Sequence, residues 1–337
     1  MNYVRLGKTG LEVAAISFGG IPIQRADAQN AKAVVDKLEE LGINYIDTAR
    51  GYTVSEEYLG QALKGRREKF LLATKSMARD YEGMKRDIDI SLSNLQTDFI
   101  DLYQIHNLPL KDFDLVFGEN GAFRALTEAK AAGKIGHIGV TAHSVESMDK
   151  LVNEYSDQIE TLMFPYNIVE IQGHEVLRRA REKDIGTIAM KPMAGGNLDD
   201  ARLALRFIAA SGVCDISIPG MGSVEEVEQN AAVADHLSPL TQEELAQVEQ
   251  VRRELGNNFC RRCNYCAPCT AGISIPNAFL FVNYIRKYGL SDWPRARYAS
   301  LDKHASDCIE CGVCETRCPY ELPIREMLKG VAKDFGY

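Results

Sequence analysis

Short apolar segments recur along the first two thirds of the chain, and several of them end in a polar or ionisable residue. Helical patterns of apolar residues follow them, as at residues 28–41, and the exits of seven segments fall 24 to 35 residues apart. These exits are Asp47, Lys75, His106, Thr141, Tyr166, Met190 and Pro219. An interval of this length accommodates one strand and one helix. Together with a first strand predicted at residues 14–19, the seven exits predict eight strands that alternate with helices. The fold class indicated is α/β, a closed (β/α)8 TIM barrel with its chemistry at the carboxyl ends of the strands.

An open, doubly wound sheet is the alternative for a chain that alternates strands and helices. Such a sheet usually binds its cofactor through a Gly-x-Gly-x-x-Gly motif after the first strand, and this chain has none there. The barrel is therefore favoured, and a phosphate-binding loop is expected late in the chain. Ahead of the barrel, residues 1–12 with Gly7 and Gly10 predict a short hairpin.

Composition limits the classes of partner. The chain has 337 residues and is 45% apolar, which is enough for one large domain and one small one. Its 39 basic residues against 47 acidic ones argue against nucleic acid or an anionic membrane as the main partner. No apolar run approaches the roughly 18 residues that a membrane span needs, and the start of the chain does not resemble a secretory signal. We therefore expect a cytoplasmic protein.

Three successive predicted strands carry an ionisable residue at their exits, namely Asp47, Lys75 and His106. Tyr52 follows Asp47 by five residues, beside a glycine. One such residue alone is more often a turn cap or a core histidine. Because strand exits meet at one end of a barrel, however, these four side chains are predicted to lie together at one mouth.

These four residues resemble, in order and local context, the catalytic tetrad of the aldo-keto reductases, over about the first 250 residues. The resemblance implies a nicotinamide cofactor and the reduction of an aldehyde or ketone, or the reverse oxidation of an alcohol. A hydride that arrives at a carbonyl carbon leaves an alkoxide, so an acid has to lie within hydrogen-bond reach of that oxygen. Tyr52 is expected to be that acid, and since a free phenol has a pKa of about 10, the ammonium of Lys75 is needed to lower it. Asp47 would hold Lys75, and His106 would orient the carbonyl or share the proton.

The segment at residues 218–224 resembles the family's cofactor-phosphate loop, although an ordinary glycine-rich turn is the alternative. Its glycines let the backbone approach a phosphate, and Ser223 can cap the helix that follows. The cofactor contacts that we expect are Thr141, Lys191, Gly220, Gly222, Ser223, Glu226 and Asn230.

The cofactor loop also departs from the family pattern. Gly220 and Glu226 stand where many members carry a Lys and an Arg that bind a 2′-phosphate, so NADH is favoured over NADPH. Met190, Met163 and Ala142 stand where an aromatic residue, a Gln and an Asn usually contact the nicotinamide.

Eight of the nine cysteines form two runs near the end of the chain, which are Cys260, Cys263, Cys266 and Cys269, then Cys308, Cys311, Cys314 and Cys318. The second run, with Pro319 after it, is the bacterial ferredoxin motif. Three cysteines in a row at this spacing favour iron over zinc. We expect an aldo-keto reductase-like domain at residues 1–255, ending in a linker helix at 241–255 that Gly256 terminates, and a ferredoxin-type domain at 256–337.

An internal repeat predicts two [4Fe–4S] clusters, because each run is followed six residues later by an isoleucine, Ile275 or Ile324, that starts an apolar helix. By the crossing rule of dicluster ferredoxins, one cluster takes Cys260, Cys263, Cys266 and Cys318, and the other takes Cys308, Cys311, Cys314 and Cys269. In the first run, two residues precede the last cysteine where three are usual. The sequence therefore does not decide whether the ligands pair in the crossed way or whether a second cluster is present. Cys214 stands apart and is expected to be a core residue before strand eight.

Three functions fit this combination. The first is a nicotinamide-dependent oxidoreductase for carbonyls and alcohols whose electrons also pass to or from the clusters. The second keeps the reductase but makes the cluster domain structural, or a docking module for a ferredoxin or another redox protein. The third is a non-catalytic nicotinamide redox sensor, which the intact tetrad disfavours. No flavin motif is evident, although a flavin is not excluded; the sequence leaves the substrate and the oligomeric state open.

Overall fold

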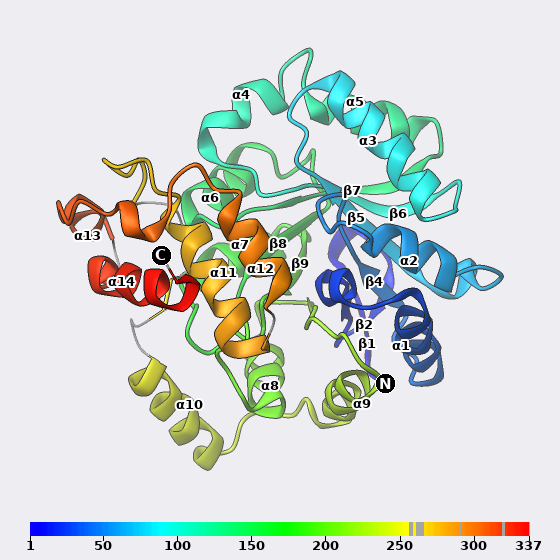
Figure 1. The fold of residues 1–337 in the computed structure, drawn as a ribbon. Coiled ribbons are helices and arrows are strands. Elements are labelled where there is room, and N and C mark those ends of the chain that lie inside the picture. The colour runs from blue at the N-terminus through cyan, green and yellow to red at the C-terminus, as the bar shows by residue number, and fades with distance from the viewer. Residues whose placement is uncertain (256–258, 261–265, 290, 319–320, 337) are drawn as a thin grey trace. The chain divides into compact units, whose positions relative to one another are not determined.

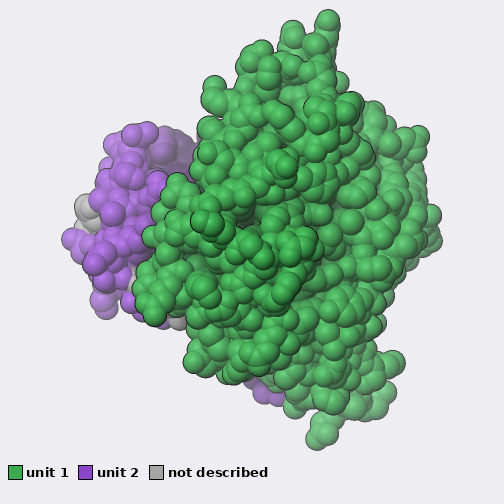
Figure 2. Space-filling model, turned by 90° about the vertical axis from the view of Figure 1, so that its right-hand side faces the viewer, with its two compact units in different colours: residues 1–249 green, residues 250–337 purple. Residues whose placement is uncertain are grey.

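The computed structural model describes residues 1–255, 259–260, 266–289, 291–318 and 321–336. It divides into two compact units, Met1–Glu249 and Gln250–Tyr337, which we call unit 1 and unit 2 (Figure 2). Helix α10 (Gln242–Leu255) crosses this boundary, so the division falls inside the helix predicted to link the two domains. Thr241 caps α10, because its Oγ1 accepts a hydrogen bond from the Glu244 amide at 3.2 Å. Gly256, predicted to end this helix, lies outside the described residues.

Unit 1 is built on eight parallel strands, each hydrogen-bonded to its neighbour in chain order (Figure 1). They are β3 (Phe18–Gly19), β4 (Tyr45–Asp47), β5 (Leu71–Ser76), β6 (Ile100–Ile105), β7 (Ile135–Thr141), β8 (Thr161–Pro165), β9 (Gly186–Met190) and β10 (Ile216–Ser217). Parallel bridges from Ile16 to Ser217 and from Gly19 to Gly220 connect the first strand to the last. The predicted fold class and strand exits are confirmed.

Helices connect the strands and pack their apolar faces on the sheet. They are α1 (Ala28–Glu40), α2 (Ser55–Ala62), α3 (Tyr81–Asn94), α4 (Phe113–Val116), α5 (Ala122–Ala131), α6 (Val145–Glu154), α7 (His174–Glu182), α8 (Ala201–Ser211) and α9 (Val224–Ala231). Short 3₁₀ helices are η1 (Gly7–Thr9), η2 (Ile21–Arg25), η3 (Arg67–Lys69), η4 (Leu110–Asp112) and η5 (Ala232–His236). Helix α1 illustrates the local causes: Asp27 caps its start by accepting from the Asn30 amide at 2.7 Å, and Gly42, at φ +75°, follows its end.

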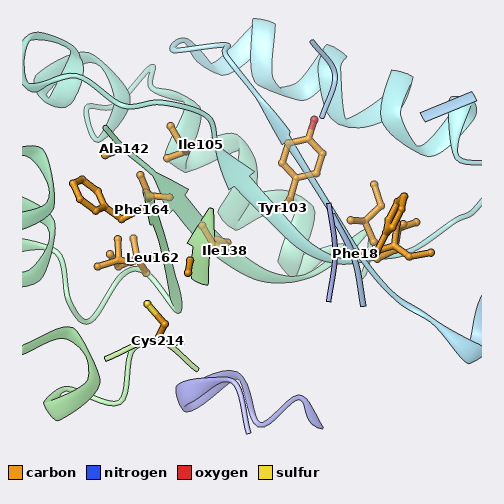
Figure 3. Close-up of a cluster of buried hydrophobic side chains, with 14 of the residues drawn as sticks. Phe18, Tyr103, Ile105, Ile138, Ala142, Leu162, Phe164 and Cys214 are labelled. Carbon is orange, nitrogen blue, oxygen red and sulfur yellow. The ribbon is translucent and has the colours of Figure 1, made fainter. Parts of the chain in front are cut away.

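Strand residues alternate between two buried clusters. Side chains that point outward, such as Tyr103, Ile105 and Phe164, pack with the helices in a large core, part of which Figure 3 shows. Cys214 belongs to this core and is buried just before β10, which confirms the prediction for this cysteine. The residues that point inward fill the barrel itself.

The amino end of the barrel is covered by a hairpin of β1 (Tyr3–Arg5) and β2 (Glu12–Ala14). Leu6 is fully buried and shares a cluster with inward-facing strand residues. The hairpin prediction is confirmed, but the barrel strand predicted to begin at residue 14 is wrong at its start, because Ala14 pairs with Tyr3 in the hairpin. The apolar run at residues 13–16 passes from one sheet to the other without a polar residue to mark the change.

Unit 2 is helical in its described part. Its helices are α11 (Ile275–Tyr288), α12 (Asp292–Ala299), α13 (Val313–Thr316) and α14 (Ile324–Phe335), with the 3₁₀ helix η6 (Ala305–Asp307). Tyr298 and Phe335 stack at its centre with their ring centroids 3.8 Å apart. Ile275 and Ile324 start α11 and α14, as the internal repeat predicted. Across the described residues of both units, no helix has the length and apolar character that a membrane crossing requires.

Candidate active site

Strands β4, β5 and β6 bring ionisable side chains to the carboxyl end of the barrel. Tyr45, Ala73 and Leu102 on these strands face the barrel interior. Since side chains alternate along a strand, Asp47 and Lys75, each two residues further on, face the same way.

A buried ion pair joins Asp47 to Lys75. Lys75 Nζ donates to Asp47 Oδ2 at 2.5 Å and to the carbonyl oxygen of Thr48 at 2.8 Å, and the two charged residues are 1% and 2% exposed. Burial alone would lower the pKa of Lys75, but the charge of Asp47 and hydrogen bonds to Asp47 and Tyr52 outweigh it and raise that pKa. Lys75 is therefore an ammonium at neutral pH.

Tyr52 lies on the loop between β4 and α2, next to this ammonium. Lys75 Nζ is 5.1 Å from the centroid of the Tyr52 ring. The Tyr52 and His106 rings meet edge to face, with centroids 6.1 Å apart and planes at 89°. The Tyr52 amide donates to the carbonyl oxygen of Ala49 at 2.9 Å, which keeps the loop tight. The structure thus brings together all four residues predicted from the sequence.

His106 follows directly after β6 and is neutral. Burial, followed by the positive charges of Lys75, Arg79 and Lys191, lowers the pKa of His106 to about 3. Its Nδ1 is buried and has no hydrogen-bond partner in the part of the chain that the structure describes. A neutral imidazole with an unused nitrogen can hydrogen-bond a substrate oxygen without carrying a charge.

The glycine-rich loop before α9 and the helix itself hold five of the predicted cofactor contacts. Ser223 caps the helix by accepting from the Glu226 amide at 3.3 Å, and Glu226 Oε2 accepts from the Gly222 amide at 2.5 Å. A Cβ at Gly220 would lie 3.0 Å from the ring of Pro22, so a larger residue would force the backbone or the ring to move. Asn230 is buried in the last turn of the helix.

The other two predicted contacts lie at strand exits, and both are held by neighbouring loops. Thr141 Oγ1 accepts from the Asn107 amide at 2.7 Å. Lys191 has a φ of +55°, unusual for a residue with a side chain, and its carbonyl oxygen accepts from Asn167 Nδ2 at 2.9 Å. Thr141, at the end of β7, and Lys191, directly after β9, are therefore each joined by a hydrogen bond to a neighbouring loop.

In unit 2, four thiols line one cavity, and they are those of Cys269, Cys308, Cys311 and Cys314. This set joins the last cysteine of the first run to three of the second. Cys311 Sγ also donates to Thr270 Oγ1 at 3.5 Å. No three His, Cys, Asp or Glu side chains among the described residues are grouped as one metal ion requires. The four thiols are the set that the crossing rule assigns to one four-iron cluster.

The structure describes three of the four remaining predicted ligands. Cys266 belongs to the same buried cluster as Cys314, and Cys260 and Cys318 pack against this cluster, as Cys269 and Cys308 do. Cys263 lies outside the described residues, as does Pro319.

Residues 15–203, more than half of the chain, match the family model described as the aldo/keto reductase family. The chain belongs to the aldo/keto reductase family. Residues 259–323 of this aldo-keto reductase match a second model, the 4Fe-4S dicluster domain. The chain is therefore an oxidoreductase with an iron–sulfur domain at its carboxyl end, in a family that typically uses NAD(P).

Relatives of this aldo-keto reductase extend over its barrel. L-galactose dehydrogenase of Arabidopsis thaliana is 27% identical in an alignment of 304 residues that covers 75% of this chain and 94% of the relative. Aldo-keto reductase YhdN of Bacillus subtilis is 30% identical in an alignment of 227 residues that covers 59% of this chain and 64% of the relative. The holo form of aldo-keto reductase AKR11C1 from Bacillus halodurans superposes with a TM-score of 0.65 at 26% identity, covering 74% of this chain and 96% of that one.

Sequence reasoning missed two residues that support the tetrad of this aldo-keto reductase. Gln104 Nε2 donates to Asp47 Oδ1 at 3.2 Å. Because Gln104 lies two residues before His106, on the same face of the strand, the sequence could have predicted that its side chain faces the site. Arg79 Nη2 donates to the carbonyl oxygens of His106 at 2.9 Å and of Asn107 at 2.8 Å. Arg79 is on a loop after β5, where no periodicity points to such a role.

The lowered pKa of His106 predicts how acid affects this aldo-keto reductase. Between pH 6.5 and about 3 the unfolded chain binds a proton at this histidine that the folded chain does not, so stability falls as the pH falls. From pH 7 to 4.5 we expect His106 to account for about 3 kcal/mol of the loss in unfolding free energy. Urea titrations at both pH values should therefore show a smaller loss for His106→Gln than for the wild type.

The exposed His236 provides the control for that experiment. His236→Gln should keep the wild-type dependence on pH. An equal loss in His106→Gln and the wild type would mean that His106 takes up its proton in the folded chain.

Proposed function

We propose that this chain interconverts an aldehyde or ketone and the corresponding alcohol, with Tyr52 as the general acid and base. The observation that carries the proposal is the buried Lys75–Asp47 ion pair beside the Tyr52 ring and the neutral His106. The group to be transferred is a hydride, which a nicotinamide bound at the barrel mouth supplies.

Each residue of the tetrad has one task in this proposal. The Tyr52 hydroxyl gives its proton to the carbonyl oxygen as negative charge develops there, and takes it back in alcohol oxidation. The Lys75 ammonium stabilises the phenolate that remains on Tyr52. Asp47 keeps the Lys75 amine protonated and holds it beside Tyr52. The neutral imidazole of His106 donates a hydrogen bond to the same substrate oxygen, and this hydrogen bond aligns the carbonyl carbon for hydride transfer.

We propose that NADH is preferred to NADPH. The residues that would hold the cofactor are Thr141, Lys191, Gly220, Gly222, Ser223, Glu226 and Asn230. The contact of Glu226 with the Gly222 amide supports the preference, because it keeps a carboxylate in the first turn of α9. A 2′-phosphate brought close to that carboxylate is repelled, and one such repulsion costs on the order of 1 kcal/mol when the charges are about 4 Å apart in water.

We also propose that unit 2 holds two [4Fe–4S] clusters and exchanges single electrons with a ferredoxin or another redox protein. The cavity lined by Cys269, Cys308, Cys311 and Cys314 supports one of these ligand sets. The other would comprise Cys260, Cys263, Cys266 and Cys318.

One anaerobic experiment tests the proposed function. Iron-replete protein is mixed with NADH or NADPH, the cluster absorption is followed, and a panel of aldehydes and ketones is then added. We expect carbonyl-dependent oxidation of the cofactor, with kcat/KM about ten-fold higher for NADH than for NADPH. No oxidation with any carbonyl, nor reduction of NAD(P)⁺ by the corresponding alcohols, would contradict the function.

The cluster absorption in the same experiment separates the two roles of unit 2. Bleaching by NADH before a carbonyl is added would mean that the nicotinamide and the clusters exchange electrons. If only dithionite bleaches the absorption, the clusters either exchange electrons with a separate redox partner or have a structural role.

A further inference from the structure

A second buried carboxylate, that of Glu56 on α2, lies outside the barrel wall. Glu56 is 1% exposed and accepts four hydrogen bonds from side chains. Its Oε1 accepts from Thr74 Oγ1 and Ser91 Oγ, each at 2.8 Å. Its Oε2 accepts from Arg50 Nη1 at 2.7 Å and Asn94 Nδ2 at 3.2 Å. A buried carboxylate with this many donors is held in one place, since losing any of them would leave a buried charge less solvated.

Two of these donors are neighbours of the residues proposed to carry the proton. Thr74 directly precedes Lys75 on β5, and because side chains alternate along the strand, Thr74 points out to Glu56 while Lys75 points into the barrel. Arg50 lies two residues before Tyr52 on the same loop, and its amide donates to the carbonyl oxygen of Lys75 at 3.0 Å. Glu56 thus ties the Tyr52 loop to the strand that holds Lys75.

The network also reaches the third strand of the site. Ser91 Oγ is 3.2 Å from the hydroxyl of Tyr103, a fully buried residue of β6, the strand that ends before His106. Figure 3 shows the Tyr103 ring standing on its strand with the hydroxyl directed into the helical layer. The carboxylate of Glu56 therefore lies among groups that come from the Tyr52 loop, from β5 and, through Ser91, from β6.

We propose that Glu56 is a positioning residue for the reaction, because its ion pair with Arg50 fixes where Tyr52 stands relative to Lys75. The inference rests on the proposed function, in which Tyr52 carries the proton. Without the Glu56 carboxylate, Arg50 has no anionic partner in this network and the loop can shift. A phenol that moves away from the ammonium loses the charge that stabilises its phenolate.

Glu56→Gln is the first test. The variant keeps an oxygen that can accept from Thr74 and Ser91 but loses the charge that pairs with Arg50. We expect kcat to fall about ten- to a hundred-fold while KM for the carbonyl changes less than about two-fold, because a displaced acid affects the chemical step rather than binding. We also expect the pH–rate midpoint for alcohol oxidation to move to higher pH, since less phenolate is present at a given pH.

A double variant, Arg50→Met with Glu56→Gln, separates positioning from stability. It removes both charges, so no unpaired buried charge remains and much of the lost thermal stability should return. If Glu56 positions Tyr52, the low kcat and the shifted pH profile persist in this stable protein. If the double variant recovers wild-type kcat and pH profile, the role of Glu56 is structural and the inference is overturned. The double variant also carries the test if Glu56→Gln alone fails to fold.

Glu160→Gln is the matched control. Glu160 pairs with Lys130 at 2.6 Å and with His137 Nδ1 at 2.7 Å, and it directly precedes β8, at the end of the barrel away from the mouth. This variant should lose stability but keep kcat and the pH profile. A wild-type protein inactive towards every carbonyl and alcohol would defeat the proposed function and this inference with it, whereas a Glu56→Gln variant as active as the wild type would defeat the inference alone.

Discussion

Tyr52→Phe lowers kcat for carbonyl reduction by about a thousand-fold, because it removes the one group proposed to protonate the developing alkoxide. General acid catalysis by a positioned side chain is worth about a hundred- to ten-thousand-fold, and here the acid is also coupled to the buried Lys75–Asp47 pair. The phenyl ring fills the same space, so the affinity for NADH should change less than about two-fold. Stopped-flow measurement of NADH oxidation gives the rate, and fluorescence titration gives the affinity.

Tyr58→Phe is the control for this substitution. Tyr58 is a partly exposed tyrosine on α2 in the same unit, and the loss of its hydroxyl should leave kcat as it is. Lys75→Met should lower kcat to a similar extent as Tyr52→Phe, because the phenolate loses its ammonium. If Tyr52→Phe changes no measured activity, the hypothesis of a nicotinamide-binding sensor without catalysis becomes the better one.

Cys269→Ala and Cys311→Ala should each reduce the iron content from about eight to about four atoms per chain, since each removes a ligand of one four-iron cluster. The decisive measurement is the double variant. Cys269 and Cys311 line the same cavity, so if they hold the same cluster, the double variant still contains about four iron atoms. Iron analysis and cluster absorption on anaerobically purified protein provide the count.

The alternative ligand pairing gives a different iron count in the double variant. If each run held its own cluster, Cys269 and Cys311 would belong to different clusters, and the double variant would lose nearly all its iron. Cys214→Ala is the control, because this thiol is buried in the core of unit 1 and should not affect the iron.

The sequence was enough to predict the barrel and the four residues at its mouth, since strand exits recur at a regular interval and three successive exits carry an ionisable side chain. Gln104 was within reach of the same reasoning, because it shares a strand face with His106. Glu56 and Arg79 were not. Their roles arise from contacts between a helix or loop and strands distant in the chain, as between Glu56 and Ser91, and no local spacing encodes such contacts.

The boundary of the first barrel strand shows a second limit. A continuous apolar run from Val13 to Ile16 is compatible with either sheet, so periodicity could not decide where the hairpin ends. Only the pairing of Ala14 with Tyr3 does so. The cysteine spacing, by contrast, limited the ligand sets to a few pairings, and the cavity in unit 2 groups one of them.

The loop before α9 has a consequence for how fast the enzyme could turn over. The Gly222 amide already donates to Glu226. If the pyrophosphate of the proposed cofactor binds at this loop, it gains this donor only by displacing a carboxylate, so binding exchanges one anion for another rather than satisfying an unpaired donor. The Glu226 carboxylate can accept the hydrogen bond of the Gly222 amide again when the oxidised cofactor leaves. With the cofactor bound as proposed, such an exchange would weaken its retention and speed its release, so that the chemical step rather than cofactor release would limit turnover.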